Sequence, residues 1–216
     1  MLEISVPFYR ERIYPKLVGM LGNPKPITDI RRQIVPLACG NVLEIGAGDG
    51  VNFAHYDLSK VNKIYALEPN PGMRRRAKEQ LNRSRLEVEF LDLPGEQIPL
   101  KDGSVDTVLS TFTFCTIPGI VEAIQGVRRV LKPGGKLIFF EHGLSPDRSV
   151  QRWQTRLEPI FRCAFVGCTM TRDIPALIAT GRFTIEQLDA GYLAPFPKAP
   201  SYCWWGIAVP KRPEEI

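Results

Sequence analysis

The stretch that decides the fold is Glu44-Ile-Gly-Ala-Gly-Asp-Gly50, which follows the apolar residues Val42 and Leu43. The apolar residues before the glycines, and Val51-Asn-Phe-Ala54 after them, predict a strand, a glycine turn and a helix. Glycines let the backbone take a positive φ and approach a ligand closely, because no Cβ is in the way. The helix would present free N–H groups at its N-terminus. The stretch therefore predicts a nucleotide-binding turn.

The spacing of the glycines narrows the class of nucleotide. A dinucleotide-binding turn reads Gly-x-Gly-x-x-Gly, and its third glycine would fall at Val51. Here the glycines stand at 46, 48 and 50, and the carboxylate of Glu44 precedes the first by two residues. A P-loop would place a phosphate-binding lysine after the glycines, and none follows. Neither of these two patterns fits.

A second acidic residue, Glu68, ends the next apolar run, 63–67, and lies 20 residues after Gly48. An acid at the tip of the second strand can accept hydrogen bonds from both ribose hydroxyls, which also excludes a 2′-phosphate. Asn70 and Pro71 then predict a helix N-cap and first helical position. Glu68 could instead be an exposed strand-end carboxylate, but its spacing from the glycines favours the ribose role.

Length and composition are those of an ordinary globular chain. Its 216 residues are 44% hydrophobic and 24% charged, which indicates a single domain over 1–216. The net charge is +5, but the basic residues are scattered apart from Arg74-Arg-Arg76, on a predicted surface helix. We therefore expect a small-molecule partner and no nucleic acid. The oligomeric state is left open.

The five cysteines (39, 115, 163, 168 and 203) form no Cys-x-x-Cys pair and show no ligand-like clustering with the two histidines. This pattern predicts a reducing compartment and no metal site. The N-terminus has neither a basic nor an apolar signal region, and no segment approaches 18 continuous apolar residues. We therefore expect a cytoplasmic protein without a transmembrane segment.

Strands alternate with helices along most of the chain, which predicts an α/β fold with a doubly wound, mostly parallel sheet and helices on both faces. The last strand is expected to be antiparallel, in a hairpin-like edge. The predicted strands are 41–45, 63–68, 86–91, 105–111, 136–141, 182–193 and 202–209. The predicted helices are 8–21, 27–37, 119–131, 148–163 and 173–180, and Lys132-Pro-Gly-Gly135 is a predicted tight turn.

Ligands of such sheets bind beyond the carboxyl ends of the strands. That edge should carry Gly46–Gly50, Glu68, Thr111–Cys115 and the pair Glu141-His142. Two segments are free to cover it: an N-terminal helical lid (about 1–38) and a substrate-side insertion (about 145–180).

The chain resembles the class I methyltransferases that use S-adenosylmethionine (SAM), over roughly residues 38–210. The matching stretches are 42–50, Ile98–Asp106 and Val127–Gly135. Shorter segments resemble the thiol S-methyltransferase subgroup, and the quinone C-methyltransferases share the same core. These segments are Gly50–Phe53, Pro94–Glu96, Cys115, Glu141-His142 and Thr171-Arg172. The resemblance implies a Rossmann-like fold, SAM as cofactor and methyl transfer to a small, partly apolar nucleophile, most plausibly a thiol.

Two features of this chain depart from the families that it resembles. Many carry an aspartate that binds the adenine amino group where this chain has Pro94, so adenine must be bound by the backbone of Gly95 and Glu96 or by the Glu96 side chain. Glu96 could equally be a turn carboxylate. The animal thiol methyltransferases begin with an apolar membrane anchor, which this chain lacks.

The resemblance implies site roles residue by residue. Glu44 would orient the methionine amino group, and Thr111 and Phe112 would lie beside the sulfonium, although Phe112 could equally be a core residue. His142 is the candidate base because imidazole titrates near neutrality; it could instead orient Glu141. The full cofactor set is Glu44, Gly46, Ala47, Gly48, Asn52, Glu68, Pro69, Gly95, Glu96, Thr111 and Phe112, and the substrate or lid set is Tyr9, Tyr14, Cys115, Trp153 and Arg172.

Other functions remain open at this point. C-methylation of a quinone precursor and N-methylation of a phospholipid head group are the alternative transfers. A NAD-binding oxidoreductase is disfavoured by Val51. A SAM-binding protein without activity would carry the same glycine turn.

Overall fold

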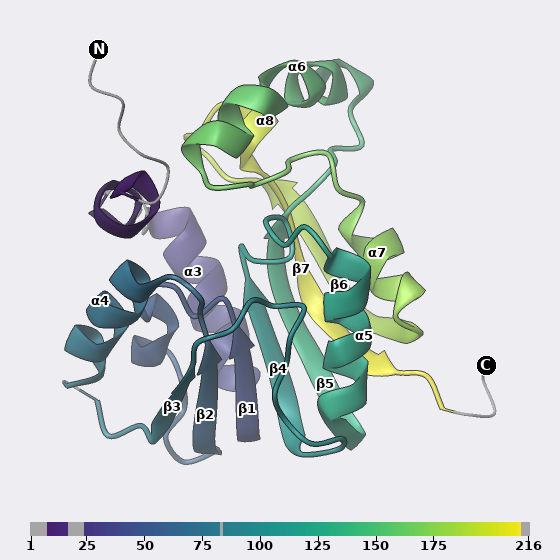
Figure 1. Cartoon of the computed structure of the whole chain (residues 1–216). Coiled ribbons are helices and arrows are strands. Elements are labelled where there is room, and N and C mark those ends of the chain that lie inside the picture. The colour runs from purple at the N-terminus through teal and green to yellow at the C-terminus, as the bar shows by residue number, and fades with distance from the viewer. Residues whose placement is uncertain (1–7, 17–23, 83, 213–216) are drawn as a thin grey trace.

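The computed structural model describes residues 8–16, 24–82 and 84–212. A seven-stranded sheet with the order β3-β2-β1-β4-β5-β7-β6 runs through the molecule. Strand β7 pairs antiparallel with both neighbours, and the other pairings are parallel. The predicted mostly parallel sheet with an antiparallel last strand is confirmed (Figure 1).

The predicted strands are all present, with ends shifted by at most two residues except at β5. They are β1 (Gly40–Ile45), β2 (Val61–Leu67), β3 (Val88–Leu91), β4 (Val105–Thr111), β5 (Leu131–His142), β6 (Phe183–Tyr192) and β7 (Tyr202–Pro210). The predicted turn at 132–135 is instead part of β5. Its extra residues bulge, because Val105 pairs with Leu131 while Thr107 pairs with Lys136.

The helical segments are η1 (Tyr9–Ile13), α3 (Lys25–Ile34), η2 (Val35–Leu37), η3 (Val51–Ala54), α4 (Pro71–Leu81), α5 (Ile120–Val130), α6 (Arg148–Ala164), α7 (Ile174–Thr180) and α8 (Lys198–Ser201). The part of the predicted helix 8–21 that lies in 17–21 falls outside the described residues. The helix predicted directly after the glycines is only the single 3-10 turn η3. The N-cap predicted before α4 is confirmed, since the Asn70 side chain accepts hydrogen bonds from the amides of Gly72 and Met73.

Helices cover both faces of the sheet, as predicted. Alternate residues of a strand point to opposite faces, so Leu43 packs with α5 and α7 whereas Val42 packs with α3 and α4. Both apolar layers are fully buried. Because the strands are sealed on both faces, their carboxyl ends are the edge where polar side chains gather.

Helices α6 and α8 and segment η1 lie beyond that edge in Figure 1, above the ends of the central strands. The Tyr9 hydroxyl donates a 2.7 Å hydrogen bond to the carbonyl of Ala164, at the end of α6. Segment η1 also packs against α4, where a Cβ on Gly72 would meet the carbonyl oxygen of Glu11. The N-terminal segment therefore reaches from α4 to α6 across the strand ends.

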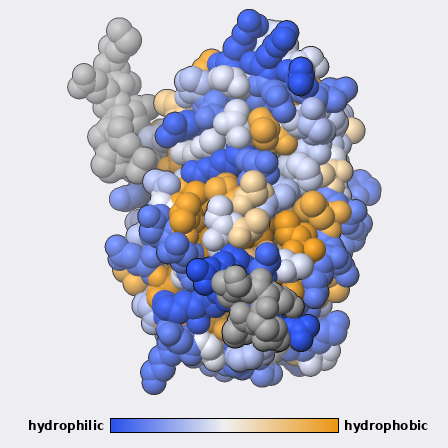
Figure 2. Space-filling view, turned by 90° about the vertical axis from the view of Figure 1, so that its right-hand side faces the viewer, coloured by the Kyte–Doolittle hydropathy of each residue, from blue (hydrophilic) through white to orange (hydrophobic). Residues whose placement is uncertain are grey.

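Strand β6 is an edge strand of the sheet, and its residue Leu188 is exposed. The side of the molecule in Figure 2 is mainly hydrophilic, with hydrophobic patches near its centre. Among the described residues, no helix is both long and apolar enough to cross a membrane.

Candidate active site

Glu44 lies at the centre of a buried hydrogen-bond network at the end of β1. Its Oε1 accepts from the Asn52 amide at 2.7 Å, and its Oε2 accepts from the Tyr56 hydroxyl at 2.8 Å. The Asn52 amide also donates to Thr111 Oγ1, at 3.0 Å. Burial raises the pKa of Glu44 to about 7, although both hydrogen bonds oppose the shift. Three predicted site residues from three segments are thus brought together.

Arg31 belongs to the same network and was missed by the sequence analysis. Its guanidinium donates to Asn52 Oδ1 at 2.5 Å and to Thr111 Oγ1 at 2.9 Å, while its Nε has no partner. Only 5% of the residue is exposed. Burial lowers its pKa, and the charge of Glu44 opposes this. A signal existed in the sequence, since Arg31 falls on the helix face of Ile27, Ile30 and Ile34.

Glu68 is a buried acceptor at the tip of β2. Its Oε2 accepts from the Gly48 amide at 2.9 Å, and its Oε1 accepts from the Asn70 amide at 2.8 Å. The exposed strand-end alternative is therefore wrong. Burial raises the pKa of this carboxyl, opposed by the two amide hydrogen bonds. Each oxygen keeps further lone-pair capacity, so the carboxylate can still accept from a diol.

Three amides of the glycine turn are already engaged, whereas a helix N-terminus was expected to offer free amides. The amides of Gly46 and Ala47 both donate to the Leu67 carbonyl, and the Gly48 amide donates to Glu68. Since η3 is a single turn, it supplies no long helix dipole. The turn instead lets a ligand approach the backbone closely. Gly48 has a φ of +56°, and the space where a Cβ would stand is open, since the nearest atom lies 3.9 Å away.

The residues expected to bind adenine lie on the loop after β3. The Glu96 side chain accepts from the Gly119 amide at 3.0 Å, at the start of α5, so it acts as a turn carboxylate. Gly95 is buried against Ile117, and Pro69 is exposed beside Glu68. Of the two alternatives for adenine, the backbone one fits this arrangement.

Glu141, at the end of β5, organises the loop after β4. Its Oε1 accepts from the Ser110 hydroxyl at 2.7 Å and the Thr113 amide at 3.0 Å, and its Oε2 accepts from the Cys115 amide at 3.2 Å. The side chain is fully buried, which raises its pKa against the effect of those bonds. Thr113 in turn contacts the glycine turn, since its side chain lies where a Cβ on Gly46 would stand.

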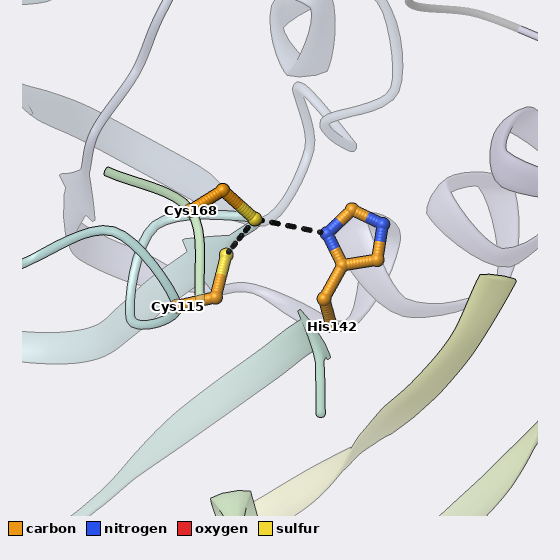
Figure 3. A group of neighbouring side chains, drawn as sticks. All are labelled: Cys115, His142 and Cys168. Atoms are coloured by element: carbon orange, nitrogen blue, oxygen red, sulfur yellow. Dashed lines mark hydrogen bonds between the residues drawn. The ribbon is translucent and has the colours of Figure 1, made fainter. Parts of the chain in front are cut away.

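His142 follows Glu141 and points into a cluster with Cys115 and Cys168 (Figure 3). The two sulfur atoms are 3.5 Å apart, and Cys168 Sγ lies 3.6 Å from His142 Nδ1. The hydrogen bond with Cys115, together with the neighbouring His142 ring and Arg172, lowers the pKa of Cys168 against the effect of burial. The expectation that the cysteines and histidines do not cluster is therefore wrong, because the three residues come from segments far apart in sequence.

The aromatic rings beside this cluster form an apolar wall. The Phe112 ring lies 4.5 Å from the His142 ring and 4.5 Å from that of Phe140, so Phe112 borders both the core and the cluster. Phe112 has a φ of 54°, an unusual conformation for a bulky residue. The Phe161 ring of α6 also faces His142, with the centroids 6.3 Å apart.

Three of the lid candidates lie in different surroundings. Tyr14 belongs at the site, because burial and the nearby Cys168, Cys115 and Glu68 all raise its pKa. Arg172 instead clamps the loop after β4, donating to the carbonyls of Phe114 and Ile117. Trp153 is 56% exposed with Arg156 over its ring, so it lies on the surface of α6.

Comparison with known sequences identifies the relatives. Residues 43–139 match the family described as a methyltransferase domain. The human thiol S-methyltransferase TMT1B is 34% identical over 152 residues, which are 68% of this chain and 62% of that protein. The human TMT1A is 33% identical over 138 residues, 62% of this chain and 55% of that protein. The chain thus spans somewhat over half the length of these relatives.

Solved structures show the same fold. A SAM-dependent methyltransferase from Leishmania major superposes with a TM-score of 0.69 at 15% identity, over 94% of this chain and 81% of that one. The sequence match and the shared Rossmann-like architecture agree over the strands that carry Glu44, Glu68 and the loop after β4. The chain therefore belongs to the methyltransferase-domain family.

Proposed function

We propose that this protein is an enzyme that transfers a methyl group from SAM to a small, partly apolar acceptor, most plausibly a thiol. The observation that carries the proposal is the pair of buried carboxylates, Glu44 and Glu68, on either side of the glycine turn. A ligand with a ribose at one end and an ammonium group at the other matches this pair.

The donor side fits SAM at both ends. Glu68 would accept from the ribose hydroxyls while its amide partners hold it in place. Glu44 would attract the methionine ammonium, and the Arg31 guanidinium behind Asn52 would favour the methionine carboxylate. Ala47, between the two glycines of the turn, and the exposed Pro69 complete the proposed cofactor contacts.

The acceptor side suits a thiol. SAM supplies a methyl group on a sulfonium, and in-line transfer disperses positive charge, so the main task of this chain's residues is to align the acceptor and exclude water. Phe112 and Phe161 supply apolar walls. A thiol with an ordinary pKa near 8.5 is already partly ionised at neutral pH. His142 is the proposed base that takes its proton. The relatives named thiol S-methyltransferases support the choice of sulfur.

Segment η1 and the 145–180 insertion are proposed to cover the site as a lid. The hydrogen bond between Tyr9 and Ala164 supports this, as does the approach of Tyr14 to both Glu68 and Cys168. We also propose a cytoplasmic location, which the free thiols of all five cysteines support. Fractionation of cells that express the tagged full-length protein tests the location.

The cofactor is tested by calorimetry with SAM, with NAD as the matched control. We expect binding of SAM with one site per chain and no binding of NAD. Binding of NAD without binding of SAM would replace the methyltransferase proposal with an oxidoreductase.

The acceptor is tested by transfer of a labelled methyl group from SAM to panels of aliphatic thiols, quinols and amines. We expect label in thioether products. Label only in quinols or in amines would move the function to C- or N-methylation, and no label in any panel despite SAM binding would leave a binding protein.

A further inference from the structure

We propose that Cys115, Cys168 and His142 bind one thiophilic divalent cation of the zinc class. The candidate ligand atoms are the two Sγ atoms and one ring nitrogen, all within 4.8 Å of one another. Figure 3 shows the three side chains pointing toward a common centre, with Cys168 between the other two. Thiolate and imidazole are the ligands that zinc takes in proteins.

The distances match a tetrahedral site. With zinc–sulfur bonds of about 2.3 Å and zinc–nitrogen bonds of about 2.0–2.1 Å, tetrahedral angles separate two sulfurs by about 3.8 Å and a sulfur from a nitrogen by about 3.6 Å. The observed separations are 3.5 Å between the sulfurs and 3.6 Å from Cys168 Sγ to His142 Nδ1. The edge from Cys115 to the ring is at most 4.8 Å, so it closes with a shift of at most about 1.2 Å.

The backbone under the ligands is held firmly. The Cys115 amide donates to Glu141, and the Cys115 carbonyl accepts from the Thr169 amide at 2.8 Å, which joins the two cysteine segments. Arg172 clamps the carbonyls of Phe114 and Ile117 on either side of Cys115. Preformed ligand positions lower the cost of binding a metal, because little side-chain freedom remains to be lost.

Charge and ligand number indicate the kind of site. Two thiolates and a neutral imidazole balance a doubly charged cation. Glu141 is engaged by Ser110 and the loop amides, so among the described residues the group holds three ligands and no fourth. Zinc sites with three protein ligands keep a fourth position for water or substrate, whereas structural sites use four. The titratable and charged groups that act on the cluster from other elements include Tyr14, Arg172 and Cys203.

One consequence rests on the proposed function. If the acceptor is a thiol, its sulfur could take the fourth position as a thiolate and release its proton to water. The thiolate would then accept the methyl group of SAM and depart as a thioether, while SAM would depart as S-adenosylhomocysteine. His142 would serve as a ligand through Nδ1 and could not accept the proton at that atom. Zinc binding and the His142 base are thus alternative ways to ionise one acceptor.

The first test uses the wild-type full-length chain without SAM or acceptor. After chelation and removal of the chelator, the protein is titrated with Zn²⁺ and, separately, with Co²⁺. We expect one cation per chain, thiolate-to-cobalt charge-transfer absorption in the near ultraviolet and intense visible bands of tetrahedral cobalt. X-ray absorption of the zinc-loaded protein should show two sulfur neighbours. A pale octahedral cobalt spectrum or a zinc shell without sulfur would overturn the proposal.

Variants then test the ligands one at a time. Cys168→Ser and His142→Ala should each lower zinc affinity at least hundredfold, while Cys163→Ser and His55→Ala, outside the cluster, should leave it unchanged. Circular dichroism checks that each variant is folded. If a variant does not fold, the cobalt and X-ray absorption spectra of the wild-type chain still decide the proposal. Unchanged zinc affinity in a folded Cys168→Ser chain refutes the site.

The outcomes separate this inference from the proposed function. Zinc binding without methyl transfer to any acceptor would refute the function and leave the metal site standing. Methyl transfer to thiols by a chain that binds no zinc would refute the metal site and return His142 to the role of base.

Discussion

The two halves of the strand-end edge are built in different ways. The glycine half comprises the ends of β1 and β2, and the hydrogen bonds to the side chains of Glu44 and Glu68 come from residues at most 20 positions away. The cysteine half comprises the ends of β4 and β5 with Cys168, and the hydrogen bonds made by the side chains of Glu141 and Cys168 join residues 26 to 53 positions apart. The first half can be recognised as a motif, whereas the second exists only after folding.

Under the proposed function, this difference assigns SAM binding to the glycine half and the choice of methyl acceptor to the cysteine half. A turn whose hydrogen bonds are mostly local does not depend on distant segments, so it can bind the same cofactor when those segments differ. A cluster assembled from three distant segments changes whenever one segment changes. We therefore expect variants of the glycine half to alter SAM affinity, and variants of the cysteine half to alter acceptor use.

Gly46→Ala should break the contact between the halves and have the largest effect. Its φ is +66°, and the added Cβ would stand 2.2 Å from Thr113 Oγ1. Left-handed strain and overpacking together predict a loss of about 2–5 kcal/mol in the free energy of unfolding. Urea denaturation measures it. Gly103→Ala is the matched control, with φ +56° and no atom within 4 Å, and should lose about 1–2 kcal/mol from strain alone. Equal losses in the two variants would mean that the halves are not in contact.

Glu141→Gln should disturb the cysteine half alone. The amide would turn an NH₂ group toward the buried donors of Thr113 or Cys115, at a cost of about 2–3 kcal/mol in unfolding free energy. Acceptor turnover should fall severalfold while the Kd for SAM stays within about twofold, by calorimetry. Ser110→Ala, which removes one donor and leaves the carboxylate, should have a smaller effect. A SAM affinity that falls as far as turnover would contradict the division into halves.

Glu68→Ala should disturb the glycine half alone. Loss of the ribose acceptor and of the Gly48 contact should weaken SAM binding by at least about tenfold, or about 1.4 kcal/mol. Glu87→Ala, at an exposed carboxylate paired with Lys63, serves as the control and should bind SAM normally. Unchanged affinity in Glu68→Ala, measured by calorimetry, removes the ribose assignment.

The smallest effect concerns pH. Because the pKa of Glu44 is raised to about 7, the carboxyl is mostly protonated below that pH and mostly ionised above it. An ammonium group prefers the ionised form, so SAM affinity should rise about threefold from about pH 6.5 to 7.5. Glu44→Gln should flatten this profile. A wild-type affinity that falls over the same interval would place the ammonium group elsewhere.

The sequence sufficed for most of the fold because its patterns are local. The glycines after an apolar run located β1, and Asn70-Pro71 located the start of α4. The Lys132–Gly135 turn was misjudged, because the pairing partner of a bulged strand is not visible in the chain itself.

The site was predictable only in part, for the same reason. Glu44 and Glu68 were expected at the strand ends from their spacing to the glycines, and Asn52 was expected from the family resemblance. Arg31 and Tyr56 were missed because their partners lie on other elements, and Trp153, a lid candidate, is exposed on α6. The cysteine and histidine cluster was judged from sequence spacing, which says nothing of segments that the sheet later brings together.

The bond between Tyr9 and Ala164 has a consequence for how ligands enter. A single neutral hydrogen bond contributes about 0.5–1.5 kcal/mol net, so it favours the joined arrangement over the parted one by a factor of only about 2 to 13. On its other side, the same segment rests on α4 through the close backbone contact at Gly72. Breaking this hydrogen bond at the α6 side would therefore cost little and would need no rearrangement of the sheet. This hydrogen bond would therefore add little to the barrier that a ligand meets on its way in or out.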